Sequence, residues 1–333
     1  MPLILTCPIC GTSVEAGSYK EVYVSPYNNQ EYKRYECPNC DVHWWEPLKI
    51  IPEFYENEVF EGYVSSHERV GTRLGENHKA FFKYFPSNVR GRLLDVGCGD
   101  GRFLRCAKEQ GFEVWGIDFD KKSVENVKRN LGIDTVFAMS LEEFYEYAKE
   151  KNLKFDVITF FEVLEHQDKP REFLEMVRGL LKEGGYIAGS VPKRGRLYVE
   201  IGWKYFDWDY PPHHFLRFSK SSLEKALNFA GFKDIEVYKL DFPFAELFLY
   251  LEKKHLGNLD KLKIKLKGMV LGDERKARAY AVEELAEVSP SKGKAYILMM
   301  LKFLRNAILL PFALRYVGKL KGNGTNQYFQ AKI

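Results

Sequence analysis

The fold is decided by the stretch Leu93-Leu94-Asp95-Val96-Gly97-Cys98-Gly99-Asp100-Gly101. An apolar run of strand type ends in an acid, alternating glycines follow, and a helical pattern begins at Gly101. Glycines in such a turn let the backbone pass close to a bound molecule, because no Cβ stands in the way. Asp95 would lie at the carboxyl edge of an open α/β sheet, where such sheets bind ligands and where a carboxylate can accept a hydrogen bond from an ammonium group. The stretch therefore predicts a ligand-binding loop between a strand and a helix.

The residues around this loop alternate between strand-like and helix-like segments. The expected strands cover 92–96, 113–119, 135–138, 155–161, 186–191, 235–240 and 326–333, and the expected helices cover 101–110, 123–130, 141–151, 170–182 and 219–230. Such alternation is typical of a parallel sheet covered on both faces. Ser219 suits the N-cap of the last of these helices, because its hydroxyl can accept from the free amides of the first turn. Since 241–318 carries no strand pattern, we expect a helical insertion before the last strand.

A second acid narrows the class of ligand. Asp118 ends the next expected strand about 20 residues after the loop, where a carboxylate takes both hydroxyls of a ribose. Phe119 follows and is placed either to lie on an adenine ring or to fill the core. A nicotinamide dinucleotide site would need a third glycine at position 102, and Arg102 stands there. A purely structural glycine turn is the remaining alternative.

Residues 92–240 resemble the class I, Rossmann-like S-adenosylmethionine-dependent methyltransferases, within the broad group that contains ubiquinone-pathway O-methyltransferases and sugar methyltransferases. Besides the glycine loop, 155–166 is similar to that family's fourth strand and its "LEH" turn, and Gly184-Gly185 is similar to the turn before its fifth strand. The resemblance implies a seven-stranded, mostly parallel methyltransferase sheet with helices on both faces and S-adenosylmethionine as cofactor, whose methionine part supplies the ammonium group for Asp95. The residues expected at the cofactor are Asp95, Gly97, Gly99, Gly101, Asp118, Phe119, Ser140 and Phe161. Where the family often has an acid near the adenine amino group, this chain has Met139-Ser140.

Two Cys-x-x-Cys pairs lie near the beginning of the chain, at Cys7, Cys10, Cys37 and Cys40. Four thiolates at this spacing can close a tetrahedral zinc site, and a β-hairpin over 20–36 fits the gap between the pairs. Because the protein would fill all four positions, we expect the zinc to be structural. Two disulfides or a redox pair are the alternatives, but six cysteines in 333 residues and the expected lack of a signal peptide favour a reducing, cytoplasmic location. Cys98 and Cys106 are expected to be packing residues.

An aromatic stretch at 203–218 follows the fifth expected strand and so lies at the same edge of the sheet as the glycine loop. Methyl transfer is a direct displacement, so the protein must mainly align the acceptor and remove its proton. Histidine titrates near neutrality and is the usual base. The candidates are His213 and His214, which the sequence does not rank; one of them could instead hold the loop. The resembled family carries a similar "PPHH…FS…SL…AGF" run here.

Other residues near this edge of the sheet have more than one interpretation. Glu165 and His166 are expected to cap the loop after the fourth strand, and Tyr63, His67 and Arg69 either close over the site or lie on the surface. Methyltransferases acting on adenine or glutamine amides show an Asn/Asp-Pro-Pro-aromatic run after the fourth strand, whereas 161–164 here reads Phe-Glu-Val-Leu. This favours a hydroxyl or an activated carbon as acceptor.

The insertion is basic and partly apolar. Residues 251–319 carry 15 Lys and Arg against 7 Asp and Glu, an excess of +8 in a chain whose net charge is +4. The segment 296–317 is apolar over most of its circumference, but Lys302, Arg305 and Arg315 interrupt it before it reaches the roughly 18 to 20 residues of a membrane span. Such a helix is covered by its own domain, by a second subunit or by a membrane interface. We expect a roof over the acceptor pocket or a homodimer face, with peripheral membrane contact through 251–317 as the alternative.

These patterns predict five segments: a zinc-ribbon-like domain (1–46), a helical linker (47–90), an S-adenosylmethionine-binding core (91–240), a basic helical insertion (241–318) and the last strand of the core (319–333). The predicted function is methyl transfer to a hydroxyl or activated carbon of a small molecule, sugar, glycan or lipid-like precursor. One alternative is an RNA methyltransferase that grips nucleic acid with the ribbon, although 1–46 is not notably basic and the aromatic stretch contains Asp207 and Asp209. The other is a non-catalytic zinc-ribbon interaction protein on a methyltransferase core.

Overall fold

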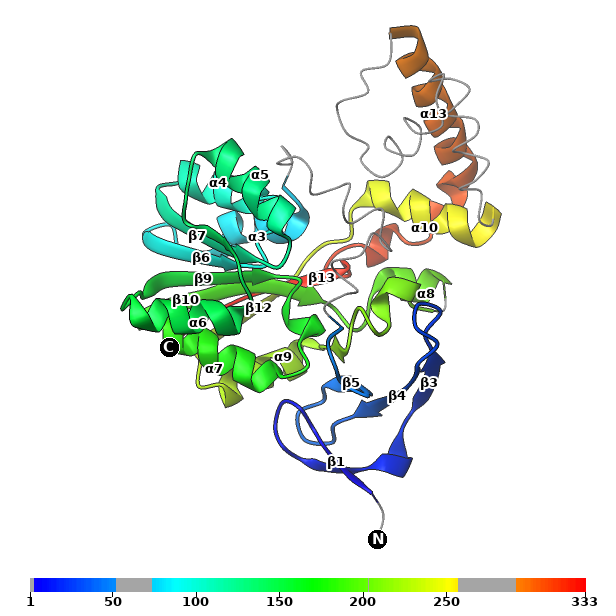
Figure 1. The fold of residues 1–333 in the computed structure, drawn as a ribbon. Helices are drawn as coiled ribbons and strands as arrows, with labels where there is room; N and C mark the ends of the chain where they lie inside the picture. Colours follow the sequence, from blue (N-terminus) through cyan, green and yellow to red (C-terminus); the bar gives the residue numbers. More distant parts are fainter. Residues whose placement is uncertain (1–2, 52–73, 203, 257–291) are drawn as a thin grey trace.

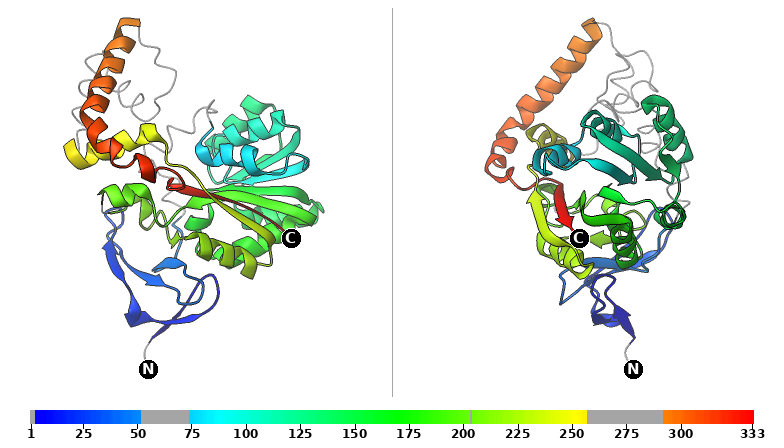
Figure 2. Two further views of the ribbon diagram at one scale, coloured as in Figure 1. Left: turned by 180° about the vertical axis from the view of Figure 1, so that it is seen from behind. Right: turned by 90° about the vertical axis from the view of Figure 1, so that its left-hand side faces the viewer.

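The computed structural model describes residues 3–51, 74–202, 204–256 and 292–333. These ranges form a central sheet with helices on both faces, a small β-domain at the N-terminal end, and a helical arm (Figure 1). The further views agree that the β-domain and the arm lie on opposite sides of the sheet (Figure 2). Tyr63, His67, Arg69 and Trp203 lie outside the described residues.

The central sheet has seven strands in the order β12-β13-β10-β9-β6-β7-β8. Strands β10, β9, β6, β7 and β8 are parallel, whereas β13 is antiparallel to both β10 and β12. Their bounds are β6 (Gly91–Val96), β7 (Phe112–Asp118), β8 (Val136–Ala138), β9 (Phe155–Phe161), β10 (Leu181–Pro192), β12 (Lys233–Lys239) and β13 (Asn326–Lys332). This confirms the predicted sheet and the insertion before its last strand. The strand order reverses at β6, and the carboxyl end of such a strand is where open α/β sheets bind ligands.

Helices cover both faces of the sheet (Figure 1). One face carries α3 (Glu76–Tyr84), α4 (Arg102–Glu109) and α5 (Lys121–Leu131), and the other carries α6 (Leu141–Glu150), α7 (Pro170–Leu180) and α9 (Lys220–Phe229). Each set buries apolar side chains in its own core, for example Phe81 and Phe103 on the first face and Phe144 and Leu223 on the second. Helix α3 is the described part of the predicted linker helix.

The starts of these helices follow from their first residues. The Asp120 carboxylate accepts a hydrogen bond from the Lys122 amide at the start of α5. Ser140 and Ser219 both form capping boxes, at the starts of α6 and α9. This confirms the predicted cap at Ser219, and it places Ser140 at a helix start beside the end of β8.

The N-terminal domain consists of two small sheets. Strand β1 (Ile4–Thr6) pairs with β2 (Ser13–Glu15), the 3-10 turn η1 (Ala16–Ser18) follows, and β3 (Glu21–Val24), β4 (Glu31–Glu36) and β5 (His43–Glu46) form an antiparallel sheet. The pair β3 and β4 is the hairpin predicted between the two Cys pairs. A fourth strand, β11 (Leu216–Arg217), joins this sheet beside β5. Two residues of the aromatic stretch therefore complete the sheet of the N-terminal domain, which the sequence did not predict.

The remaining described elements form a helical layer at the edge of the sheet. Helices α8 (Leu197–Gly202), α10 (Phe244–Leu256) and α13 (Lys292–Leu314) pack around Ile201, Leu247, Leu251 and Leu309. The 3-10 turns η3 (Leu164–His166), η4 (Asp207–Asp209) and η5 (Val317–Lys319) complete the structure. Among the described residues, no helix has both the length and the apolar character needed to cross a membrane.

Candidate cofactor and acceptor site

A cavity of about 830 Å³ lies at the carboxyl ends of β6, β7, β8 and β9. The predicted cofactor residues that line it are Asp95, Gly97, Gly99, Asp118, Phe119, Ser140 and Phe161. Both candidate bases, His213 and His214, line the same cavity. The structure thus brings residues from four successive strand ends together with the predicted acceptor stretch.

At two positions of the loop after β6, the backbone conformation and the close neighbours both require glycine, for a different reason at each position. Gly97 has a φ of +76°, and a Cβ there would come within 2.7 Å of the Val163 side chain in the loop after β9. Gly101 has a φ of +75°, and a Cβ there would come within 2.8 Å of Val127 on α5. Gly101 is not among the residues that line the cavity. Gly101 lets the start of α4 approach Val127 on α5, while Gly97 keeps the backbone open beside the cavity.

Asp95 is a buried acid at the end of β6. Its side chain is 3% exposed, and Oδ1 accepts a hydrogen bond of 2.7 Å from the hydroxyl of Thr159. Burial raises the pKa of Asp95 to about 8, because the charged form loses its hydration. An ammonium group bound beside this carboxylate would restore the favourable environment for its charge.

Asp118 is held by backbone amides at the end of β7. Oδ2 accepts from the amide of Gly99 at 2.8 Å, and Oδ1 accepts from the amide of Asp120 at 3.0 Å. These bonds orient the carboxylate beside the glycine loop. The adjacent Phe119 is 59% exposed, so it is not a core residue and its ring remains accessible at the cavity.

Sequence reasoning missed several residues that line the cavity. Asn77 and His78 come from α3, whose register the linker pattern did not resolve. His78 packs edge-on against Phe161 at 4.7 Å between ring centroids, and burial lowers its pKa to about 4. Glu142, in the first turn of α6, also lines the cavity. The sequence does carry a signal for Glu142, because it is an acid only four residues beyond the end of β8.

A cluster of three histidines lines the side of the cavity where the sequence predicts the methyl acceptor, here named the acceptor side. The ring centroids of His166, His213 and His214 lie 4.6 to 4.8 Å apart. Nδ1 of His166 lies 2.6 Å from the carbonyl oxygen of His213, and Nδ1 of His214 lies 3.2 Å from Oδ1 of Asp209. Because a carboxylate oxygen can only accept, Nδ1 carries the proton in the neutral His214 ring, and Nε2 of that ring is a proton acceptor. Burial lowers the pKa of all three imidazoles, so they are neutral near pH 7.

The same cluster contains a fully buried carboxyl group. Oε1 of Glu165 lies 3.9 Å from Nε2 of both His166 and His214. Neither carboxyl oxygen has a hydrogen-bond partner among the described residues. Burial and the nearby Glu162 raise the pKa of Glu165 well above its usual value. The three histidines offer ligand atoms within 4.8 Å of one another, which is close enough to hold a metal ion.

A buried polar network supports His214 from behind. Asp209 is 0% exposed and contacts Arg196 and Tyr198 as well as His214. Although burial alone would raise it, these partners together lower the pKa of Asp209 below its usual value, so it stays ionised. Nη2 of Arg217 donates to the backbone oxygen of Asp209 at 3.1 Å. This network fixes the orientation of the His214 ring.

The four predicted zinc ligands come together in the N-terminal domain. The Sγ atoms of Cys7 and Cys40 lie 3.6 Å apart, those of Cys10 and Cys37 lie 3.4 Å apart, and all four lie within 4.8 Å of one another. Tetrahedral zinc with Zn–S bonds of about 2.3 Å separates its sulfur ligands by about 3.8 Å. The donor set therefore fits zinc. His43 instead contacts Arg34 through Nδ1 at 2.9 Å.

The remaining two cysteines lie away from this cluster. Cys98 belongs to the glycine loop, its side chain is buried in the core of the α4 face, and it also borders the cavity. Cys106 is half-buried on α4.

The strand order, the glycine loop and the cavity at the switch point together define a class I, Rossmann-like S-adenosylmethionine-dependent methyltransferase fold. Residues 66–237, slightly more than half of the chain, match a family model described as a methyltransferase domain. The chain belongs to this methyltransferase family.

Individual proteins show more distant similarity. The ubiquinone biosynthesis O-methyltransferase of Nitrosospira multiformis is 28% identical over 169 residues, which cover 49% of this chain and 62% of that protein. The enzyme of the same name from Nitrosomonas europaea is 28% identical over 189 residues, covering 54% and 72%. A solved structure of phosphoethanolamine N-methyltransferase 2 from Haemonchus contortus is 16% identical with a TM-score of 0.47, covering 91% of this chain and 69% of that chain. The match thus spans less than two thirds of the length of the first of these relatives.

Proposed function

We propose that this protein transfers a methyl group from S-adenosylmethionine to a hydroxyl, or to an activated carbon, of a small molecule, sugar, glycan or lipid-like precursor. One observation carries the proposal: a single cavity has the predicted cofactor loops on one side and the histidine cluster on the other. Similarity to ubiquinone biosynthesis O-methyltransferases supports a hydroxyl acceptor.

On the cofactor side, each of the acidic side chains has a proposed role in binding S-adenosylmethionine. Asp95 would bind the ammonium group of the methionine part, and Asp118 would bind the ribose hydroxyls. The open backbone at Gly97 and Gly99 would let the cofactor lie against the loop. Glu142 is the acid best placed for the adenine amino group, because it lines the cavity just beyond β8.

On the acceptor side, we assign the general base to His214 and keep His213 as the alternative. S-adenosylmethionine supplies an electrophilic methyl group on a sulfonium. The acceptor oxygen forms a bond to the methyl carbon as the carbon–sulfur bond breaks, and the acceptor proton passes to Nε2 of His214. Asp209, bonded to Nδ1, then stabilises the imidazolium. His214 is favoured because only a base with a fixed tautomer presents the same lone pair at every turnover.

The N-terminal domain is proposed to bind a structural zinc ion through its four cysteines. Residues 1–46 carry 3 Lys and Arg against 6 Asp and Glu, so the ribbon is acidic. Nucleic-acid binding relies on Lys and Arg neutralising phosphates. A small-molecule acceptor is therefore favoured over RNA, and a salt-sensitive gel shift with RNA would reverse that preference.

The arm formed by α13 exposes apolar side chains, among them Met299, Phe303, Ile308 and Leu314. This supports two of the expected coverings of the insertion, a second copy of the chain or a membrane interface. The third, a roof over the acceptor pocket, gains no support from α10 and α13, because none of their described residues lines the cavity. Light scattering would detect the dimer. Sedimentation with vesicles containing anionic lipid would detect the membrane contact.

The proposed activity is tested with S-adenosylmethionine labelled in its methyl group and a panel of hydroxyl-bearing quinols, sugars and glycans. We expect label in an acid-stable ether or other covalent product for at least one member of the panel. Label transfer to RNA alone, or to none of these acceptors while the cofactor binds, would contradict the hydroxyl assignment.

A further inference from the structure

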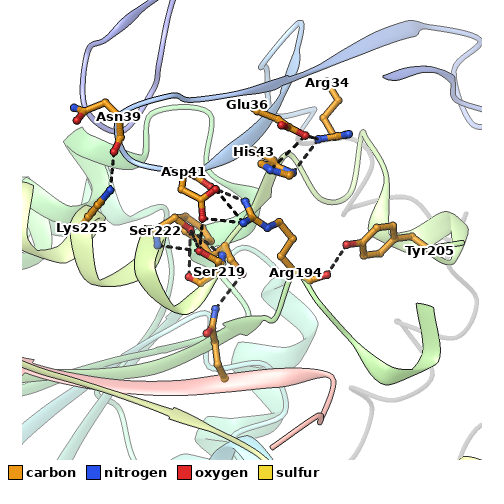
Figure 3. Close-up of polar contacts among 12 residues, drawn as sticks. Arg34, Glu36, Asn39, Asp41, His43, Arg194, Tyr205, Ser219, Ser222 and Lys225 are labelled. Atoms are coloured by element: carbon orange, nitrogen blue, oxygen red, sulfur yellow. Dashed lines mark hydrogen bonds and ion pairs between the residues drawn. The ribbon is translucent and has the colours of Figure 1, made fainter. Parts of the chain in front are cut away.

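The acceptor segment, residues 193–219 between β10 and α9, is held at both ends by one residue of the N-terminal domain (Figure 3). Near its beginning, Nη2 of Arg194 donates to the two carboxylate oxygens of Asp41 at 3.0 and 2.8 Å, and Nη1 donates to the Asp41 backbone oxygen at 2.7 Å. At its end, the hydroxyl of Ser219 donates to Oδ2 of Asp41 at 2.7 Å. Asp41 therefore bridges the two ends of the segment that carries the histidine pair.

The position of Asp41 depends on the Cys37–Cys40 turn. Asp41 directly follows Cys40 and has a φ of +64°, a left-handed conformation that a surrounding turn must maintain. The amide of Asp41 donates to the carbonyl oxygen of Cys37 at 3.0 Å, and the amide of Cys37 donates to the carbonyl oxygen of Val42 at 2.9 Å. A metal ion held by Cys37 and Cys40 would fix this turn, and so would fix the carboxylate of Asp41.

A second tie runs from the same turn to the core. Nζ of Lys225, on α9, donates to the carbonyl oxygen of Asn39 at 2.7 Å (Figure 3). It reaches α9 just beyond Ser219, so it holds the helix that ends the acceptor segment. It does not reach the beginning of that segment.

The middle of the acceptor segment is also attached to the N-terminal domain. The Trp45 amide donates to the carbonyl oxygen of Phe215 at 3.1 Å, and the Phe215 amide donates to the carbonyl oxygen of Glu165 at 3.0 Å. Phe215 follows His214 directly and is fully buried. One line of backbone hydrogen bonds therefore joins the ribbon to the η3 turn through the neighbour of the proposed base.

Aromatic contacts strengthen this middle attachment. The Tyr210 ring stacks on Tyr23 with centroids 4.3 Å apart, and its hydroxyl donates to Glu21 at 3.1 Å. The Arg217 guanidinium lies 5.4 Å from the centroid of the Trp45 ring, which belongs to β5 of the N-terminal domain. Tyr210 and Arg217 lie on both sides of His213-His214 in the chain. The ribbon thus forms the outer support of the acceptor side.

We propose that Asp41 is a positioning residue: it transmits the geometry of the metal-binding turn to the acceptor segment and so holds the His214 ring at the cavity. This inference rests on the proposed function, because only that function makes the His214 ring a general base. On this proposal, the N-terminal domain helps to shape the acceptor site of the enzyme.

The test compares Asp41→Ala and Asp41→Asn in the full chain with Glu31→Ala, a control that removes an exposed acid elsewhere on the ribbon. Hydrogen exchange of backbone amides in 205–218 should rise at least about tenfold in Asp41→Ala, as expected for the loss of charge-assisted hydrogen bonds. Amides of β6, β7 and β9 should keep their exchange rates, and the affinity for S-adenosylhomocysteine should stay within about twofold, because the cofactor side makes no contact with Asp41. Asp41→Asn should be intermediate, since its amide keeps an acceptor oxygen but loses the charge.

A spectroscopic readout separates positioning from general stability. In the wild type, the ring nitrogens of His214 should show the tautomer protonated at Nδ1, and in Asp41→Ala they should shift toward an average of both tautomers. Chelation of the metal from the wild type should reproduce the exchange pattern of Asp41→Ala. Unchanged protection in 205–218 and unchanged His214 signals in Asp41→Ala would overturn the proposal. It would also be overturned if Asp41→Ala lost both the protection of amides throughout the core and the ability to bind the cofactor. A wild type that shows the predicted pattern but methylates no hydroxyl would contradict the proposed function only.

Discussion

The cofactor side and the acceptor side of the cavity are built in different ways. Asp95, Gly97, Asp118 and Ser140 belong to three consecutive strand–helix units, and local backbone geometry positions them. The acceptor side combines the η3 turn, the stretch around His214 and the N-terminal ribbon, which lie far apart in the sequence. The cofactor side therefore depends on local folding, whereas the acceptor side depends on long-range contacts between side chains and domains.

Among substitutions on the two sides of the cavity, His214→Ala is expected to have the largest effect, and that effect is on kcat. Loss of a general base should lower kcat by about 10²- to 10⁴-fold. Cofactor affinity should stay within about threefold, since the substitution lies on the acceptor side. Steady-state kinetics with an identified acceptor and calorimetry with S-adenosylhomocysteine measure the two quantities.

His213→Ala is the matched variant, and His255→Ala on α10 is the control outside the cavity. His213→Ala should reduce kcat less than His214→Ala, and His255→Ala should leave it unchanged. If both single variants and the double variant keep the full rate, the assignment of a histidine base is wrong.

The second effect is on the cofactor side alone. Asp118→Ala should weaken cofactor binding by at least about 100-fold, because it removes an acceptor of charge-assisted hydrogen bonds and frees the Gly99 amide. Isothermal titration calorimetry measures the change, with the exposed Asp134→Ala as control. Near-wild-type affinity in Asp118→Ala would show that the ribose lies elsewhere.

Asp95→Asn should change stability and binding in opposite directions. The pKa of Asp95 is about 8 in the folded chain and near 3.9 in an unfolded one, so between these values the folded state binds more protons. Wild-type stability should therefore fall as pH rises from about 4 to 8 through this group, and Asp95→Asn should remove that contribution. Its Tm relative to wild type should rise between pH 6 and 8 without cofactor, while cofactor affinity should fall.

Thermal melting at several pH values, with and without S-adenosylhomocysteine, checks both parts. The difference in Tm between Asp95→Asn and the wild type would be constant with pH if Asp95 were ionised throughout. That result would contradict the assignment of Asp95 as a buried carboxyl group whose charged form is stabilised only when the ammonium group of the cofactor is bound.

The smallest effect expected is a displaced pH profile. Burial lowers the pKa of His214, although its contact with Asp209 opposes this change. The neutral, proton-accepting form should therefore persist below pH 6.5, and kcat should begin to fall only at a lower pH. A rate profile between pH 5 and 8 measures this, and a fall centred at or above pH 6.5 would contradict a buried His214 base.

Much of the fold follows from local patterns in the sequence. The predicted range 155–161 coincides with β9, and the expected range of β6 differs from the observed one by a single residue. Strand β10 is longer than predicted, because it begins at Leu181 and contains a register shift before Tyr186. Glycines and capping residues act over a few positions, so their effects can be read directly. Pairing of β11 with β5 joins residues about 170 positions apart, and no local pattern encodes it.

The candidate site divides in the same way. Asp95 and Asp118 could be predicted because each ends a strand whose apolar pattern is clear. The role of Asp41 could not, because its partners Arg194 and Ser219 become neighbours only after the ribbon packs against the core. Asn77 and His78 were missed for a related reason: helix α3 reaches the cavity through packing on the sheet rather than through a strand end.

Calorimetric titration of the full chain with S-adenosylmethionine, and separately with S-adenosylhomocysteine, tests the central claim most directly. We expect saturable binding of each at one site per chain, with Asp118→Ala abolishing the heat and His214→Ala preserving it. If the wild type binds neither compound, the chain is not a methyltransferase, and its cavity would belong to a non-catalytic protein on the same fold.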